Sequence, residues 1–304
     1  MLWAFFLALK KVSEVSVLSL FMPWNTRFRS HTDATRPSSA GAVAKSLGKV
    51  WLVGAGPGDP ELISVRALRL LRSAEVVIHD RLVAAELLAE CSRGAKLIDV
   101  GKRPGHHAVP QAEIEALLIQ QAQLGKNVVR LKGGDPFIFG RGGEEMAALH
   151  AAGISCEVVP GITAAAGCAA AAGFPLTQRH VADSVCLVTA THENDNDESH
   201  WSSLAADHRR TLVFYMGLSR LQQIQQRLTA HGLPGSTPAA LIENGTTHCQ
   251  RRVFCTLDDI SAEALRHGLT SPCLLVVGQV VALAAEASPV ASLVNSSQPL
   301  RNFS

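Results

Sequence analysis

The segment best suited to hold a ligand is the glycine-rich loop Gly54-Ala55-Gly56-Pro57-Gly58. It follows an apolar run, Val50 to Val53, that predicts a strand. Asp59 suits an N-cap, and Pro60 suits a first helical turn because proline has a fixed φ and no amide hydrogen. Glycines let a ligand approach the backbone, but they also serve ordinary tight turns. The motif alone leaves both a nucleotide cradle and a simple strand-to-helix turn open.

Four more predicted strands end in loops rich in glycine, proline or ionisable residues. They are expected at 75–79, 96–100, 127–131 and 155–159. The residues that follow them include Asp80, Lys102, the loop 133–135 and Thr163. An open parallel sheet binds ligands outside the carboxyl ends of its strands. We therefore expect these loops to face one site, together with the glycine loop.

The segments between these strands have helical periodicity, which predicts a parallel α/β unit. Apolar residues recur at helical spacing from Glu61 to Ser73, and Gly125 and Gly153 suit helix C-termini. Further helices are expected at 84–89, 110–124, 144–152 and 164–172. A second half begins near Gln178, where the composition changes. It is expected to contain strands at 185–190, 211–215, 239–243, 252–256 and 273–277 and helices at 218–231 and 258–267.

The composition favours a globular protein of a reducing compartment. Of 304 residues, 47% are hydrophobic and 18% are charged, so one or two domains fit, and two are favoured. The net charge of +2 gives no support for a basic face that binds nucleic acid. Seven cysteines occur without a CxxC pair, which signals neither a zinc site nor a disulfide framework and favours the cytoplasm.

The two ends are expected to lie outside the folded part. Met1 to Leu9 is apolar, but it lacks a basic preceding segment and is far shorter than the ~20 residues of a membrane span. Residues 25–46 are typical of a disordered leader or an organelle transit peptide, and a true start at Met22 would also explain the apolar opening. Residues 286–304 are expected to form a flexible tail.

A dinucleotide fold is the first alternative for the glycine loop, because Asp80 stands at about the distance where an acid would bind a ribose. However, Asp59 occupies the place of the third glycine, and Pro57 lacks the amide hydrogen that pyrophosphate would need. A Walker loop does not fit, because no Gly-Lys-Ser/Thr follows.

Five motifs together resemble the uroporphyrinogen-III C-methyltransferases, a family of the tetrapyrrole methylase superfamily. They are VGAGPGD at 53–59, HDRLV at 79–83, GKR at 101–103, RLKGGDPFIFGRGG at 130–143 and VPGITA at 159–164. The likeness extends from about Lys49 to Leu283, and GKR followed by RLKGGDPFIFGRGG is its most specific part.

The resemblance implies an α/β fold of two α/β domains, with a mainly parallel first sheet, a mixed second sheet and an active-site cleft between the domains. It also implies a homodimer, and the length matches the standalone enzyme rather than bifunctional sirohaem synthases. The implied boundaries are a disordered or wrongly assigned leader at 1–47, domains at 48–160 and 161–285, and the tail at 286–304.

The resemblance further implies contacts to a methyl donor, S-adenosylmethionine. Glycines would let the backbone approach the donor, Asp135 could bind its amino or hydroxyl groups, and Met216 could lie against the adenine. Without the resemblance, core packing is the ordinary role of such a methionine. The implied donor contacts are Pro57, Gly133, Gly134, Asp135, Ile138, Thr163, Ala164, Met216 and Gly245.

The catalytic positions implied by the resemblance are Asp80 as proton acceptor and Lys102 as proton donor. Methyl transfer to a pyrrole carbon leaves a cationic ring, which a carboxylate can stabilise before it accepts the proton. An unperturbed lysine keeps its charge at neutral pH, so Lys102 could equally anchor a substrate carboxylate. Both roles stay open.

The activity implied is transfer of two methyl groups to C2 and C7 of uroporphyrinogen III, giving precorrin-2 for sirohaem and, in some organisms, cobalamin. The eight carboxylates of this substrate require cationic side chains, and Arg141, Arg103 and Lys132 are the predicted ones, Arg141 first. No metal, nucleic acid or membrane partner is implied. The alternatives are methylation of a later precorrin, modification of RNA or protein by another superfamily member, and a ligand-binding protein without activity.

Overall fold

The computed structural model describes residues 46–101, 109–190 and 198–286. The predicted leader at 1–47 lies outside this range except for its last two residues, and the predicted tail lies outside it except for Glu286. Lys102 and Arg103 also fall outside the described residues, so the roles predicted for them stay predictions.

The first sheet is parallel throughout, as the sequence predicts, with strand order β3-β2-β4-β1-β5. In its register, Gly54 of β1 pairs with Lys132 of β4, and His79 of β2 pairs with Leu131. The carboxyl ends of these three strands are therefore level. The strands are β1 Val50–Gly54, β2 Val76–His79, β3 Lys96–Asp99, β4 Val128–Lys132 and β5 Cys156–Val159.

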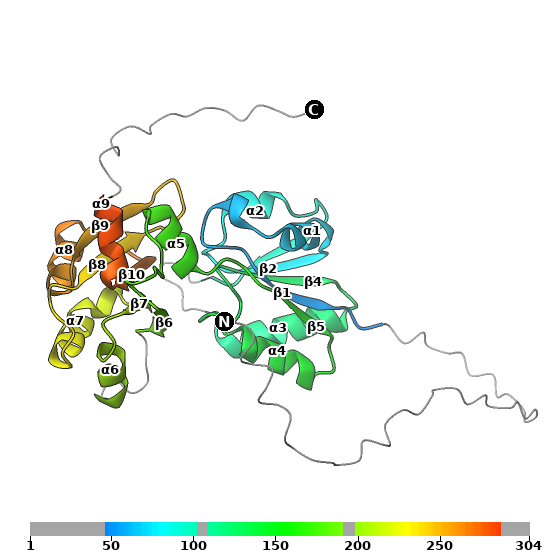
Figure 1. Cartoon of the computed structure of the whole chain (residues 1–304). Helices are drawn as coiled ribbons and strands as arrows, with labels where there is room; N and C mark the ends of the chain where they lie inside the picture. The colour runs from blue at the N-terminus through cyan, green and yellow to red at the C-terminus, as the bar shows by residue number, and fades with distance from the viewer. Residues whose placement is uncertain (1–45, 102–108, 191–197, 287–304) are drawn as a thin grey trace, which may run out of the picture. The chain divides into compact units, whose positions relative to one another are not determined.

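Helices cover both faces of this sheet, so neighbouring strand residues belong to different cores (Figure 1). Val53 and Val77 pack with α1 and α2, whereas Leu52 and Ile78 pack with α3 and α4. Burial on both faces explains the nearly continuous apolar runs of the sequence. The helices are α1 Val65–Ser73, α2 Ala85–Ala89, α3 Gln111–Gln123 and α4 Gly142–Ala151.

The segment after the glycine loop differs from the predicted single helix. Pro60–Leu62 forms a short 3₁₀ helix, and the Asp59 carboxylate caps it by accepting a hydrogen bond from the Glu61 N–H at 2.9 Å. Ile63 is then extended, and Ser64 caps α1 through the Ala67 N–H. The Asp59 cap is thus confirmed, but a second capping residue starts the α-helix later.

The second sheet is mixed, also as predicted, with strand order β6-β7-β10-β8-β9. Only β6 and β7 pair in parallel, and the other pairs are antiparallel. The strands are β6 Ser184–Thr189, β7 Arg210–Tyr215, β8 Pro238–Glu243, β9 Arg251–Thr256 and β10 Cys273–Val277.

This sheet also packs helices on both faces, with α6, α7 and α8 against one and α5 and α9 against the other. The sequence did not predict α6 or α9, and α7 and α8 each follow a 3₁₀ turn that the predicted helices had included. The helices are α5 Ala164–Ala172, α6 Glu198–Ala205, α7 Leu221–Ala230, α8 Ile260–Arg266 and α9 Ala282–Glu286.

None of the helices in the described ranges is long and apolar enough to cross a membrane. All seven cysteines lie in those ranges and are free thiols.

A buried carboxylate fixes the end of β8, where the loop that carries Gly245 begins. Glu243 is 2% exposed, forms an ion pair with Arg251, and accepts hydrogen bonds of 2.6 Å from the Thr270 N–H and hydroxyl. The hydrogen bond from Arg251 and those from Thr270 outweigh the effect of burial and lower the pKa of Glu243 to about 2. Charge and hydrogen bonds at this one side chain therefore stabilise the fold beside the loop.

Glu243→Gln is expected to destabilise the protein by about 1–3 kcal/mol at neutral pH, because Gln loses the charge-assisted hydrogen bonds. The folded-state pKa lies below the ordinary 4.5. The stabilisation by the carboxylate is therefore fully present above pH 4.5 and is lost as the pH falls toward 2. Urea unfolding at several pH values measures this difference. The exposed pair of Glu90 with Arg72 provides the control Glu90→Gln, expected within about 0.5 kcal/mol of wild type. A Glu243→Gln deficit that did not change with pH would contradict this account.

Candidate functional site

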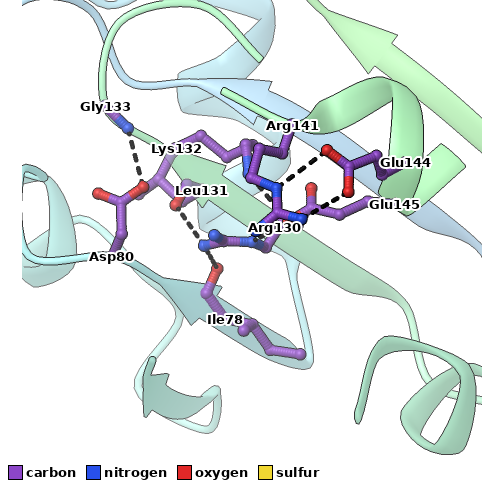
Figure 2. Close-up of polar contacts among 9 residues, drawn as sticks. All are labelled: Ile78, Asp80, Arg130, Leu131, Lys132, Gly133, Arg141, Glu144 and Glu145. Atoms are coloured by element: carbon purple, nitrogen blue, oxygen red, sulfur yellow. Dashed lines mark hydrogen bonds and ion pairs between the residues drawn. The ribbon is translucent and has the colours of Figure 1, made fainter. Parts of the chain in front are cut away.

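Asp80 lies where β2 ends and points toward the end of β4 (Figure 2). Its Oδ2 accepts a hydrogen bond from the Gly133 N–H at 3.3 Å, and its Oδ1 accepts one from the Leu82 N–H at 3.1 Å. A Cβ atom on Gly133 would lie only 2.8 Å from the Leu82 Cβ. Glycine at 133 therefore allows this close approach, and the predicted meeting of Asp80 with the Gly133 loop is confirmed.

Three glycine loops contact one another through their backbones at the same edge of the sheet. The Gly134 N–H donates to the Gly56 carbonyl at 2.7 Å, and the Gly56 N–H donates back at 3.2 Å. Both residues have positive φ, which favours glycine. A Cβ on Gly161 would lie 2.2 Å from the Gly134 carbonyl oxygen. The loops after β1, β4 and β5 thus form one continuous surface.

The Asp135 carboxylate joins two of these loops. Its Oδ1 accepts from the Phe137 N–H at 2.8 Å, and its Oδ2 accepts from the Gly161 N–H at 3.0 Å. The carboxylate is thus already hydrogen-bonded to the protein, and its predicted contact to a donor stays a prediction.

The glycine loop also contacts the loop after β8. The Asp59 N–H donates to the Thr246 hydroxyl at 2.9 Å, and Gly58 lies against the Gly245 carbonyl. Pro57 packs against Gly167 of α5, where a Cβ would lie 2.5 Å from the proline ring. The structure therefore brings together Pro57 and Gly245, two predicted donor contacts that are far apart in the sequence.

Tyr215 is a residue of this site that the sequence analysis missed. Its hydroxyl lies 2.6 Å from the Thr163 hydroxyl and accepts a hydrogen bond from the Ala165 N–H at 2.9 Å. Its ring lies 4.9 Å from that of Phe139, between centroids. Burial raises the pKa of Tyr215, so the hydroxyl stays neutral. The available signal was that the chain has a single tyrosine, at the end of a predicted strand and directly before Met216.

Five large apolar side chains on the loops around these residues are exposed. Met216 is 52% exposed and adopts positive φ. Ile138, which is partly buried, lies between the exposed Phe137 and Phe139 in the sequence. Such a rim can bind a flat, mostly apolar ligand. Its members are Leu82, Phe137, Phe139, Ile162 and Met216.

The two predicted substrate cations in the described residues differ in exposure. The Arg141 side chain is 55% exposed, has left-handed backbone geometry and pairs with Glu144 at 2.6 Å. Lys132 is 4% exposed, and its ammonium donates to the Glu145 carboxylate at 2.9 Å (Figure 2). The predicted contact of Lys132 with substrate is therefore not available without a rearrangement, whereas Arg141 is accessible.

The described residues contain no group of three or more His, Cys, Asp and Glu side chains placed to hold a metal ion. What they do bring together is a carboxylate, close-packed glycine backbones, the hydroxyl of a half-buried tyrosine and an apolar rim with an arginine. This arrangement can bind a flat ligand, hold carboxylates and accept a proton at Asp80.

Comparison with known proteins gives concordant matches. A family model described as tetrapyrrole (corrin/porphyrin) methylases matches residues 49–261. The chain is 54% identical to a siroheme synthase of Azotobacter vinelandii, in a match that covers 80% of this chain and 52% of that protein. It is 52% identical to siroheme synthase 2 of Serratia proteamaculans, in a match that covers 84% of this chain and 54% of that protein. The chain thus spans about half the length of these relatives.

Solved structures agree with these matches. A uroporphyrin-III C-methyltransferase from Thermus thermophilus, complexed with S-adenosyl homocysteine, has a TM-score of 0.65 at 38% identity and covers 78% of this chain and 94% of its own. A cobalt precorrin-4 methyltransferase has a TM-score of 0.69 at 28% identity, and the match covers 77% of this chain and 95% of that protein.

Gly161→Ala is expected to destabilise the protein by about 1–3 kcal/mol, because the new methyl group would overlap the Gly134 carbonyl. Thermal unfolding measures the effect. Gly143→Ala is the matched control, since no atom lies within 4 Å of a Cβ there and alanine favours the helix by up to ~1 kcal/mol. Equal unfolding temperatures for the two variants would show that the loops are not packed as described.

Proposed function

The chain belongs to the tetrapyrrole (corrin/porphyrin) methylases, and we propose that it methylates uroporphyrinogen III at C2 and C7 to give precorrin-2. One observation carries the proposal: Asp80 is held against the Gly133 N–H in a chain 38% to 42% identical to solved uroporphyrin-III C-methyltransferases. The methyl donor is S-adenosylmethionine, since the solved relative binds S-adenosyl homocysteine, which this donor becomes after transfer.

The glycine loops fit this donor. A Cβ on Gly134 would have no neighbour closer than 3.9 Å, and those nearest atoms belong to Thr163 and Ala164 at the start of α5. The positive-φ glycine therefore lies within van der Waals reach of two predicted donor contacts, without a clash. Tyr215 fixes the position of both by its hydrogen bonds to Thr163 and the Ala165 N–H. Gly133, Asp135, Ile138, Pro57, Met216 and Gly245 are the further donor contacts of the proposal.

When bound, the donor supplies an electrophilic methyl group to a pyrrole carbon, and the methylated ring must then lose a proton. Asp80 carries the negative charge that stabilises such a cationic ring, and its carboxylate is the proposed proton acceptor. Its two backbone hydrogen bonds fix its orientation. Positioning of the reacting carbons supplies much of the rate in such reactions. In the proposal, Lys102 donates a proton or anchors a substrate carboxylate.

The substrate proposed here is a flat macrocycle with eight carboxylates. The exposed apolar rim can pack against its rings, and Arg141 can bind a carboxylate with two parallel hydrogen bonds. Arg103 is proposed to bind a second carboxylate. Lys132 would need to leave Glu145 to bind substrate directly.

The product would serve sirohaem synthesis, which fits the names of the curated relatives, and cobalamin synthesis is a further proposed use. Because the chain spans half of those relatives, the proposal covers methylation only. It also includes a homodimer, located in the cytoplasm. The second candidate is methylation of a later precorrin, which the likeness to a cobalt precorrin-4 methyltransferase favours.

Purified protein incubated with methyl-labelled S-adenosylmethionine and uroporphyrinogen III is expected to yield a dimethylated product by mass spectrometry. A trimethylated precorrin offered in parallel tests the second candidate and is expected to stay unlabelled. Label on the later precorrin alone would refute the proposed substrate.

Asp80→Asn is expected to reduce kcat at least about 100-fold, within the range typical of a lost general base. Asn has the shape of Asp but a single acceptor oxygen, so it can keep only one of the two backbone hydrogen bonds. The dissociation constant for S-adenosyl homocysteine should still stay within about threefold of wild type, as calorimetry would measure. Full turnover in Asp80→Asn would remove the role assigned to this carboxylate.

A further inference from the structure

Three charged side chains are buried together beneath the end of β4 (Figure 2). Arg130 and Lys132 come from β4, and Glu145 comes from the first turn of α4. Their side chains are 4%, 5% and 0% exposed. We call these three residues the buried triad.

Glu145 joins the two cations through a single oxygen. Its Oε1 accepts from the Arg130 Nε at 3.0 Å and from the Lys132 Nζ at 2.9 Å, while its buried Oε2 has no hydrogen-bond partner among the residues that the structure describes. Arg130 also donates to the backbone carbonyls of Ile78 and Leu131. Two positive charges thus face one negative charge, and the triad carries one net positive charge.

Asp80 is the carboxylate outside the triad that interacts electrostatically with Lys132. Burial lowers the pKa of Lys132, and the Arg130 cation lowers it further, whereas the Glu145 and Asp80 carboxylates oppose this change. The pKa of Lys132 is lowered on balance, and the two nearby carboxylates limit this lowering because they favour the charged ammonium. The residue after Lys132 is Gly133, whose N–H donates to Asp80. Charge and backbone both connect the triad to Asp80.

Several other charged or titratable groups of the described residues lie around the triad and do not replace this charge. Arg141 and Glu144, from the start of α4, pair with each other at the surface. Cys156, from β5, has a raised pKa because of burial and the Glu145 carboxylate, so its thiol is neutral. Arg81, beside Asp80, has interactions of its own.

Stability alone does not account for such a cluster. Apolar residues of similar volume in place of a buried ion pair are often neutral or stabilising, because the charges lose their hydration. A net charge at this position has a further consequence when a polyanion approaches. Substrate carboxylates near Asp80 would favour its protonated form, and exposed arginines would already be paired with those carboxylates. A buried cation does not reach the substrate, so the substrate carboxylates cannot pair with it.

We propose that the buried triad is a positioning element for Asp80, whose net positive charge keeps this carboxylate ionised and directed at the Gly133 N–H while a polyanionic substrate is bound. The inference rests on the proposed function for the identity of the substrate. It assigns Lys132 and Glu145 to the site through Asp80 rather than through contact with substrate.

A set of four proteins tests the net charge. Lys132→Met removes one cation and leaves the triad neutral. Glu145→Gln removes the anion and leaves two positive charges. The double variant, Lys132→Met with Glu145→Gln, has one positive charge again, on Arg130, as in wild type. The exposed pair of Lys126 with Glu75, 2.9 Å apart, provides Lys126→Met and Glu75→Gln as matched controls.

The acid limb of the pH profile of kcat, which reports the substrate-bound enzyme, is expected to follow the net charge. It should move to higher pH in Lys132→Met and to lower pH in Glu145→Gln, each by roughly half to one pH unit, and return toward wild type in the double variant. Binding of S-adenosyl homocysteine should change by less than about threefold, since the triad acts on Asp80 rather than on the donor loops. The controls should match wild type.

A purely structural role gives a different result, because thermal unfolding temperatures would fall while all acid limbs coincide, and that outcome would overturn the proposal. The proposal would also be overturned if the acid limb of the double variant stayed at the pH found for Lys132→Met, since the net charge would then not cause the shift. Carbon-13 NMR can follow the titration of the Asp80 carboxyl in the unliganded proteins, without any turnover, and Asp80→Asn assigns its signal. The titration midpoints of the four proteins are expected in the same order as their acid limbs. Failure of wild type to methylate uroporphyrinogen III would therefore refute the proposed function, while this titration still decides whether the triad acts on Asp80.

Discussion

The close approach of three backbone loops at the carboxyl edge of the first sheet is the constraint on which the site depends. Gly56 and Gly134 exchange backbone hydrogen bonds, and Gly161 lies so close to the Gly134 carbonyl and to Gly54 that there is no room for a side chain at position 161. The parallel register makes this approach geometrically available, because it ends β1 and β4 at the same level. Asp80 and Asp135 then use backbone N–H groups of these loops to fix their own orientations.

Charge is divided between two environments around Asp80. Arg141 is exposed and can exchange its Glu144 partner for a ligand carboxylate, whereas Arg130 and Lys132 are enclosed with Glu145. Exposed charges are screened by water and salt, but buried charges act on their neighbours with little screening. Under the proposed function, a site for a polyanion benefits from both kinds, because the exposed cation can bind the ligand while the buried ones maintain the charge of the Asp80 carboxylate.

The family relationship and the geometry answer different questions. Membership in the tetrapyrrole methylases follows from a match over most of the folded residues, and it fixes the class of reaction and the donor. The choice of macrocycle and of ring carbons does not follow from the fold, because solved relatives with this fold are named for different corrinoid and porphyrin substrates. In the proposed function, that choice depends on the rim and on cations such as Arg141. A shared fold therefore narrows the substrate class without selecting its member.

The sequence by itself determined both sheets, the direction of the first one and the loops that meet at its edge. Periodicity and glycine positions are local signals, which is why β10 and α5 have their predicted bounds, while α6, a short amphipathic helix beside a polar loop, was missed. Only the tertiary structure decided that Lys132 is buried against Glu145 and that Tyr215 holds Thr163. These pairs join separate elements, and a side chain's partner and exposure depend on which elements pack beside it. Spacing along the chain carries no record of that packing.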